Sequence, residues 1–330
     1  MSVSVVVAPA LDRAPATRTG LAGVAAFIAL AFTLTVALPL ATYTTSVALF
    51  GLAHVLSELN YIGRRFGARL GRLAWPIGGP ILIAVAARAA ATQGLIPPAV
   101  DAGIELGAAT LLAGVAAWRM RHHRAAGALA GFVLGAGAVA APFQTLLGLA
   151  ILHNLTPLGF FAEALDGERR RRALFLLAVP FVGLPLLIAT GLPYGALARA
   201  GLAWPEARLL VSGPLAFNLG VYVPASLVSS EWALHAFSAA VFAQIMHYAA
   251  VIVLLPRLAD QSDARPLPPW RRRGLVAGLL AAVVLAIFFL VDYGLARQLY
   301  GMAALVHSWL EIPVLLVALG GIAAAQRTRA

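Results

Sequence analysis

Two stretches near opposite ends of the chain each place a glutamate four residues after a histidine within an apolar run. They are "GLAHVLSE", with His54 and Glu58, and "HSWLE", with His307 and Glu311. Residues i and i+4 share one helix face, so each carboxylate is expected one turn from its histidine. Such a carboxylate can ligate a metal ion, or it can accept the ring N–H of a histidine ligand and fix its orientation. A hydrogen bond that only satisfies two buried polar groups is the third interpretation.

Two further histidines lie in apolar surroundings, His153 in "ILHNL" and His247 in "QIMHY". Neutral imidazole is the commonest protein ligand of metals and suits iron, copper and zinc. The predicted metal ligands are therefore His54, His153, His247 and His307, with Glu58 and Glu311 as ligands or orienting groups. Six such groups are enough for one ion or two. Glu58, Glu311 and Tyr248 are the candidate catalytic groups, although Tyr248 is also typical of a packing aromatic.

The remaining ionisable residues are interpreted without a role in this site. His122 and His123 stand in the arginine-rich stretch "RMRHHRAAG", which is typical of a solvated loop, and His235 is expected near the membrane interface. Arg88 interrupts an apolar run, where it could pair with a buried carboxylate or with the acidic group of a ligand, although extension to the interface is the expected outcome. Asp101 and Glu105 fall near the end of the next run and are expected to be solvated.

The elements that carry these residues are expected to be membrane-spanning helices. The chain is 61% hydrophobic and 11% charged, with a mean hydropathy of +0.89, whereas about a quarter of residues are charged in soluble domains. Several windows of about 20 residues are long enough to cross a bilayer as helices. Runs such as "GLLAAVVLAIFFLV" show no alternation, which excludes a β-barrel. The fold class is therefore all-α, a polytopic integral membrane protein.

The positions of the arginines predict how the chain is threaded through the membrane. All 24 basic residues are arginine, and their clusters fall between apolar runs, as in cytoplasmic loops. This placement explains the net charge of +11 without a nucleic-acid partner. We expect about ten transmembrane helices in a bacterial-type cytoplasmic membrane, with both termini cytoplasmic. The predicted spans are roughly residues 21–41, 44–63, 75–94, 101–118, 125–141, 143–165, 173–192, 232–256, 274–293 and 298–322.

The chain is expected to form a single transmembrane domain over residues 1–330, with a short cytoplasmic segment at 1–20. Residues 193–231 are apolar but broken by Gly213, Pro214 and Pro224, which predicts a re-entrant or extracytoplasmic segment. The absence of cysteine excludes disulfides and thiolate metal ligands.

The four candidate ligands fall on four spans that all run from outside to inside. Counted from the outer ends, three of them lie about ten residues deep and His247 about fifteen, which places them within one or two turns of a common depth. Ionisable groups at this depth are costly and usually face the interior of a bundle. The four imidazoles are therefore expected to converge near the midplane.

Two motifs that would identify other kinds of metal centre are absent from the sequence. There is no His-Glu-x-x-His zinc-protease motif and no clustered histidine box of the membrane desaturases. Single histidines on four helices leave an open face on an iron ion, where dioxygen and a lipophilic substrate from the bilayer could meet.

The motifs resemble those of the membrane β-carotene 15,15′-dioxygenases of the Brp/Blh type. "GLAHVLSE" is similar to that family's early Gly-x-Pro-His-x-x-x-Asp element, "HSWLEIP" to its late His-then-acid element and "IMHYAAV" to its late histidine-bearing span. His247 stands alone where the family has two histidines four apart, and glutamate replaces the usual aspartate. The resemblance implies a polytopic fold, non-haem iron held by histidines with acidic residues nearby, and a carotenoid-like or lipid substrate.

Two alternatives remain open at this point. Histidines on separate helices are also typical of haem b proteins, and buried His and Glu residues occur in proton-coupled or metal transporters. Copper or zinc could replace iron in the same donor set. The expected partners are a lipophilic substrate, dioxygen and membrane lipids, and the sequence does not indicate an oligomeric state.

Overall fold

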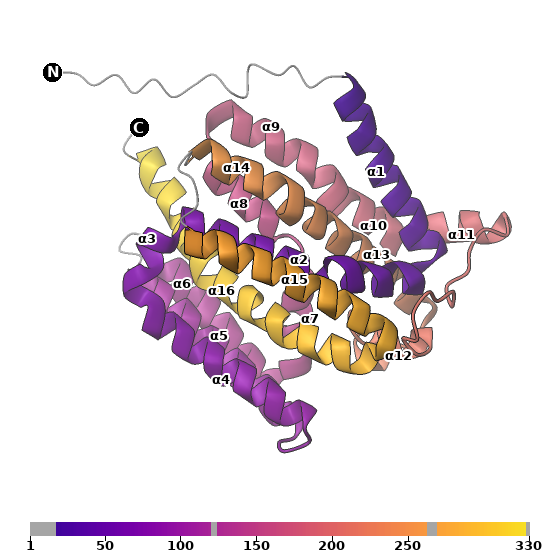
Figure 1. Cartoon of the computed structure of the whole chain (residues 1–330), viewed down its shortest axis with the longest axis horizontal. Coiled ribbons are helices and arrows are strands. Elements are labelled where there is room, and N and C mark those ends of the chain that lie inside the picture. The colour runs from indigo at the N-terminus through magenta and orange to yellow at the C-terminus, as the bar shows by residue number, and fades with distance from the viewer. Residues whose placement is uncertain (1–17, 120–123, 263–268, 328–330) are drawn as a thin grey trace.

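A computed structural model describes residues 18–119, 124–262 and 269–327 of the chain (Figure 1). Every regular element in these ranges is a helix, as the all-α prediction requires. The first nine are α1 (Arg18–Ala37), α2 (Pro39–Arg65), α3 (Gly67–Leu70), η1 (Gly71–Leu73), α4 (Ala74–Thr92), α5 (Pro98–Arg119), α6 (Arg124–Ala140), α7 (Pro142–His153) and α8 (Thr156–Ala164). The rest are α9 (Gly167–Ala178), η2 (Val179–Gly183), α10 (Leu184–Ala189), α11 (Leu192–Arg199), α12 (Leu215–Leu219), η3 (Ala225–Leu227), α13 (Glu231–Ala249), η4 (Ala250–Leu254), α14 (Leu255–Ser262), α15 (Pro269–Val291) and α16 (Tyr293–Arg327). Residues 1–17 of the predicted N-terminal segment, with His122 and His123, lie outside the described ranges.

Seven segments in the described ranges are long and apolar enough to cross a membrane. They are α2, α4, α5, the run from α9 to α10, the run from α13 into α14, α15 and α16. The pair α7 and α8 makes an eighth if its two helices, bent by 45°, count as one span, and α1 and α6 contain shorter apolar helices. The ten predicted spans therefore fall on helical segments of a multi-pass membrane protein, and the number that cross the bilayer stays a prediction.

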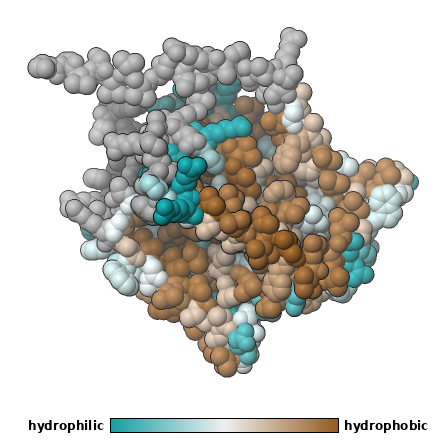
Figure 2. All heavy atoms as spheres, in the orientation of Figure 1, coloured by the Kyte–Doolittle hydropathy of each residue, from teal (hydrophilic) through white to brown (hydrophobic). Residues whose placement is uncertain are grey.

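The outer surface is apolar, as expected for helices that face lipid. Figure 2 shows a largely hydrophobic face, with hydrophilic residues gathered toward its edges. On α15, Val284, Leu290 and Val291 are each more than half exposed. Side chains of this size are costly to expose to water but not to hydrocarbon.

Helices α2 and α16 lie at the centre of the bundle, between two groups of neighbouring helices. In Figure 1, α2, α15 and α16 run side by side across the middle, α4 to α6 lie below them, and α8, α9, α13 and α14 lie above. Three apolar clusters surround this centre, around Phe242 and Val251, around Phe237 and Phe289, and around Leu106. The polar groups between them are thereby removed from both lipid and water.

Residues 193–231 form short helices and loops. They include α11, α12 and η3, and the segment is tied to the bundle where the Trp204 N–H donates to the Ala37 carbonyl at 2.7 Å. Gly213 has φ +78°, a conformation that favours glycine. Whether the segment is re-entrant or extracytoplasmic stays a prediction.

The expectation that Asp101 and Glu105 are solvated is wrong, and Arg88 takes the alternative of pairing with buried carboxylates. Arg88 of α4 forms ion pairs with Asp101 at 2.8 Å and Glu105 at 2.6 Å, both on α5, and the two acidic residues are only 5% and 2% exposed. The hairpin of α4 and α5 brings opposite charges together, so that each is neutralised within the bundle instead of extending to water.

Candidate metal centre

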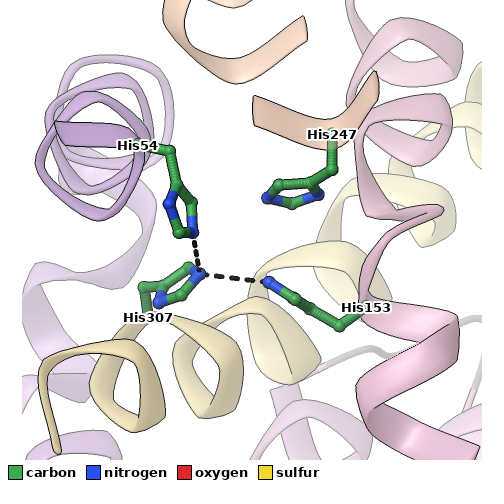
Figure 3. A group of neighbouring side chains, drawn as sticks. All are labelled: His54, His153, His247 and His307. Carbon is green, nitrogen blue, oxygen red and sulfur yellow. Dashed lines mark hydrogen bonds between the residues drawn. The ribbon is translucent and has the colours of Figure 1, made fainter. Parts of the chain in front are cut away.

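Four histidines from four helices converge at the centre of the bundle. His54 lies on α2, His153 ends α7, His247 lies on α13 and His307 on α16, and Figure 3 shows the four rings turned toward one another. One ring nitrogen from each can be chosen so that all four lie within 4.8 Å of one another. His54, His247 and His307 are buried to 1% exposure or less. The structure thus brings together all four histidines that the sequence singled out.

The spacing of three of these nitrogens fits a common metal ion. His307 Nε2 lies 3.2 Å from His54 Nε2 and 3.1 Å from His153 Nε2. Two nitrogens bound to one ion at about 2.1 Å lie roughly 3.0 Å apart at a right angle and roughly 3.4 Å apart at the tetrahedral angle. The observed distances fall between these values, so an ion bound to His307 Nε2 can also contact either neighbouring nitrogen with little movement of the rings.

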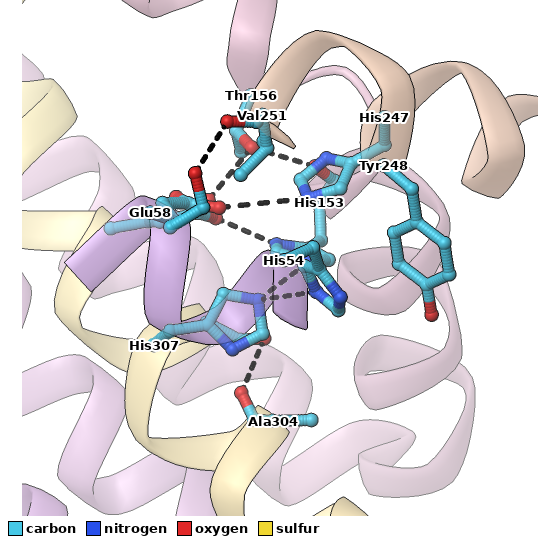
Figure 4. A network of polar contacts seen from close by, with 12 residues as sticks. His54, Glu58, His153, Thr156, His247, Tyr248, Val251, Ala304 and His307 are labelled. Atoms are coloured by element: carbon cyan, nitrogen blue, oxygen red, sulfur yellow. Dashed lines mark hydrogen bonds and ion pairs between the residues drawn. The ribbon is translucent and has the colours of Figure 1, made fainter. Parts of the chain in front are cut away.

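The second nitrogen of two of these rings faces an acceptor. His54 Nδ1 lies 3.3 Å from the Phe50 carbonyl, one turn earlier on α2, and His153 Nδ1 lies 2.7 Å from Glu311 Oε2. His307 Nδ1 has no hydrogen-bond partner among the described residues. Figure 4 shows the polar contacts around these rings. A ring that donates its Nδ1 proton keeps a lone pair at Nε2, which is how ligating histidines are usually oriented. The Nε2 lone pairs of His54 and His153 therefore point toward the space between the rings, where a metal ion would bind.

The fourth histidine is accompanied by a carboxylate. His247 Nε2 lies 3.6 Å from Glu58 Oε2, and both side chains are fully buried. Neither nitrogen of His247 has a hydrogen-bond partner among the described residues, and neither oxygen of Glu58 has one. A buried carboxylate with free oxygens beside a buried imidazole with free nitrogens is stabilised by a shared cation or proton.

The two carboxylates do not pair with the histidines four residues before them. Glu311 accepts from His153 of α7 rather than from His307, and Glu58 lies against His247 of α13 rather than His54. At His54 the outer nitrogen already faces the Phe50 carbonyl one turn back. Each His-x-x-x-Glu unit therefore gives one imidazole to the centre and one carboxylate to a neighbouring helix.

Irregular helices position His153 and His247. Pro157 has no N–H to donate to the His153 carbonyl, and its ring excludes a regular turn there, so the segment breaks into α7 and α8. The Thr156 hydroxyl forms a hydrogen bond with the His153 carbonyl instead, at 2.8 Å. Its Oγ1 also lies 2.8 Å from Glu311 Oε1. After His247 the chain passes into the π-helical η4, where Ser57 donates to the Val251 carbonyl at 2.8 Å. Such π segments are frequent at functional sites.

Tyr248 packs on the site rather than reaching into it. Its ring stacks on His54 with 4.1 Å between centroids and an interplanar angle of 26°. Its hydroxyl lies 3.0 Å from that of Tyr300. Thr156, Ser57 and Tyr300 were not predicted, because a hydroxyl in an apolar helix gives no sequence signal of which neighbour it contacts. The proline after Thr156 was the available indication of a break.

His235, which was not assigned to the centre, lies apart from it. Its ring faces Tyr194, with 5.3 Å between centroids. It also covers Gly191, where a Cβ atom would lie 2.7 Å from His235 Nε2. His235 thus has a packing role between α11 and α13.

A cavity of about 920 Å³ reaches the site from one side. It is lined mainly by α7, α16 and residues 220–226, and it meets the centre at His153, Thr156 and Glu311. His153 is the least buried of the four imidazoles, with a side chain 17% exposed. Mostly apolar pockets of this size with a few polar groups are typical of small-molecule sites.

Comparison with known proteins returned no matching family model, no significantly similar curated protein and no significantly similar solved structure. The resemblance to the β-carotene dioxygenases therefore rests on the three short motifs around His54, His247 and His307.

Proposed function

We propose that the chain is a membrane-embedded metalloenzyme, a non-haem iron oxygenase that acts on a lipophilic substrate. The observation that carries the proposal is the set of three Nε2 atoms linked by distances of 3.1 and 3.2 Å, with the outer nitrogens of His54 and His153 engaged. An all-imidazole set suits iron, copper and zinc. Iron bound there would supply the activation of dioxygen beside the cavity.

The protein's own residues support such a reaction in three ways. The apolar clusters exclude water from the centre, Glu311 and the Phe50 carbonyl fix two of the rings, and the cavity admits a substrate beside His153. Glu58 is placed to accept or release a proton next to His247, at 3.6 Å. The resemblance to the β-carotene dioxygenases favours a carotenoid-like or lipid substrate.

The geometry favours a bare ion over haem, the main alternative. Axial imidazole nitrogens on one haem iron lie roughly 4 Å apart on opposite faces of the macrocycle. His307 Nε2 is closer than that to both neighbouring nitrogens, and the His153 and His307 ring centroids are 4.8 Å apart. There is no room for a porphyrin between these rings.

Elemental analysis of the purified protein, with its visible absorption spectrum, tests the proposal. We expect about one or two iron ions per chain without a Soret band. Replacing His54, His153, His247 or His307 by alanine is expected to remove most of the bound metal, whereas His122→Ala, His123→Ala and His235→Ala retain it. Full occupancy in one of the four variants would remove that residue from the site. A Soret band, or no metal in the unaltered protein, would overturn the proposal.

The enzyme class is tested by oxygen consumption. The iron-loaded protein in lipid nanodiscs is expected to consume dioxygen when carotenoids or long-chain lipids are added, and His54→Ala is expected not to. If the loaded protein instead releases its ion across a sealed vesicle membrane, the transporter alternative replaces the oxygenase.

A further inference from the structure

The cavity beside His153 extends to a second polar site that the proposed oxygenase function does not use. Arg88 and Glu105 line it together with the apolar side chains of α7 and α16. Their ion pair of 2.6 Å joins α4 to α5, and Asp101 holds the other side of Arg88 at 2.8 Å. The cavity therefore joins a polar site at Arg88 to the histidine centre.

The shape of the cavity fits a long molecule. One face of α16 lines it from Gly301 to Leu315, a length of roughly 21 Å at 1.5 Å per residue. Phe143 and Leu152 of α7 form part of the wall and are each more than half exposed on the apolar surface. A molecule dissolved in the bilayer can thus enter from the side without crossing water.

The charges at the polar site select the head group of that molecule. At this end of the cavity the charged side chains in the lining are one arginine and one carboxylate, whose formal charges cancel, and Asp101 pairs with Arg88 from outside the lining. The Arg88 side chain is 35% exposed, and that of Glu105 is 3% exposed. A carboxylic acid would meet Glu105 and an amine would meet Arg88, each at the cost of like-charge repulsion. A hydroxyl is neutral and can accept from Arg88 while it donates to Glu105.

We propose that this cavity binds a long-chain lipophilic alcohol, with its hydroxyl held by Arg88 and Glu105 and its apolar body beside His153. The inference names the substrate class of the proposed oxygenase and rests on that function for its biological meaning. Binding itself depends on the cavity alone. An alcohol ligand would also distinguish this chain from an enzyme that acts on pure hydrocarbons. The hydroxyl head group would be recognised, and the part that reacts would be the remote apolar chain.

Equilibrium binding to the full-length protein in nanodiscs tests the head-group preference. The probe is tritiated geranylgeraniol, competed with its methyl ether and with the acid and the amine of the same chain. We expect saturable binding of the alcohol, about tenfold or more tighter than the ether, because the ether cannot donate to Glu105. Equal binding of alcohol and ether, or no saturable binding, would overturn the proposal.

Two substitutions at the polar site test the assigned contacts by changing selectivity rather than by abolishing binding. Glu105→Gln removes the negative charge and is expected to improve binding of the acid relative to the alcohol. Arg88→Gln removes the positive charge and is expected to improve binding of the amine. A misfolded variant would lose all ligands together, so opposite shifts cannot arise from instability. If both variants keep the original ranking, the head group is not at Arg88 and Glu105.

A cavity-filling variant tests the path along α16. Gly301 lines the cavity, and a Cβ atom built there has no neighbour within 4 Å. Gly301→Leu is therefore expected to fold normally and to weaken binding of the alcohol by tenfold or more. Gly114→Leu is the matched control, since Gly114 is an exposed glycine of α5 with equally open surroundings and lies outside the cavity. Unchanged binding in Gly301→Leu would overturn the proposal.

The failure of this inference differs from that of the proposed function. If the protein holds iron but does not bind the alcohol, the proposed substrate class is wrong and the proposed metal centre stands. If the protein binds the alcohol but holds no iron, the proposed ligand of the cavity is supported and the proposed oxygenase function is wrong.

Discussion

At the residue scale, the outer nitrogen of each imidazole determines what its inner nitrogen can do. His54 faces a backbone carbonyl and His153 faces Glu311, so that both present Nε2 to His307. One proton on His307 Nε2 can satisfy only one of these two neighbours in a network without metal. A cation satisfies all three at once, which favours a ligand set over a structural hydrogen-bond network.

Glu311 is predicted to hold the metal centre together through His153. Glu311→Ala removes the acceptor of the 2.7 Å hydrogen bond and is expected to lower metal affinity by about tenfold to a hundredfold. Glu311→Gln keeps an acceptor oxygen and is expected to lose less metal affinity than Glu311→Ala. Metal titration with a competing chelator measures both effects.

Glu163→Gln is the control for this loss. Glu163 is a carboxylate of comparable burial that pairs with Arg65 at 3.0 Å, away from the histidines. An equal loss of metal affinity in the control would mean that the Glu311 effect reflects general destabilisation.

Tyr248 is predicted to act through its ring and not through its hydroxyl. The ring stacks on His54 at 4.1 Å, whereas the hydroxyl is directed to Tyr300. Tyr248→Phe is therefore expected to keep both the metal content and the oxygen consumption of the unaltered protein. Tyr248→Ala removes the ring that stacks on His54, so that the imidazole is held less firmly, and is expected to lower metal affinity several-fold. A loss of turnover in Tyr248→Phe at full metal content would instead assign the hydroxyl a catalytic role.

At the element scale, the sequence predicted where helices lie better than where they break. The predicted span 143–165 is divided into α7 and α8 with a 45° bend. The cause, Pro157, is visible in the sequence, but the hydroxyl that satisfies the freed His153 carbonyl is not. The π-helical η4 was not predicted, because its stabilising contact comes from Ser57, nearly two hundred residues earlier in the chain.

Helix α6 packs on α5 through small residues, as membrane helices often do. Gly127, Gly131 and Gly135 repeat every four residues on one face, and all three face α5. The approach is closest at Gly127, where a Cβ atom would lie 2.6 Å from Ala117 Cβ and 2.8 Å from Ala117 Cα. At Gly131 the nearest atoms are 3.8 and 3.9 Å away, which is ordinary contact.

These distances predict opposite results for two identical substitutions on α6. Gly127→Ala forces α5 and α6 apart and is expected to destabilise the protein by about 1–3 kcal/mol. Gly131→Ala has room and is expected to be neutral, or to stabilise by up to about 1 kcal/mol through helix propensity. Thermal unfolding in detergent measures both, and equal effects would contradict the close packing at Gly127.

At the scale of the whole molecule, polarity is arranged from the inside outward. Four histidines and two glutamates occupy the centre, apolar clusters surround them, and large apolar side chains cover the described surface. The sequence predicted this centre because buried ionisable groups are rare enough in apolar helices to be conspicuous. For Arg88 it offered pairing with a buried carboxylate only as an alternative and did not identify Asp101 and Glu105 as the partners, since these depend on how the hairpin of α4 and α5 packs.

The arrangement of the chain in the membrane follows from its arginines and can be tested without removing any native thiol. The chain has no cysteine, so a single introduced cysteine is the only site that a maleimide can label. Asp166, between α8 and α9, and Arg208, in the segment between α11 and α12, are both exposed. The positive-inside distribution predicts that Asp166 lies on the cytoplasmic side and Arg208 on the opposite side.

In intact cells, a membrane-impermeant maleimide is therefore expected to label Arg208→Cys and to leave Asp166→Cys unlabelled until the membrane is permeabilised. Asp166 follows the bent pair of α7 and α8, and Arg208 follows the run that ends at α10. The result thus reports whether an odd number of crossings separates them. Labelling of both from the same side would mean that the run from α9 to α10 does not cross, and the polar site at Arg88 would then need a new orientation in the bilayer. Labelling from opposite sides would place the cavity's polar end toward the outer leaflet, where the hydroxyl of a lipophilic alcohol already lies among lipid head groups.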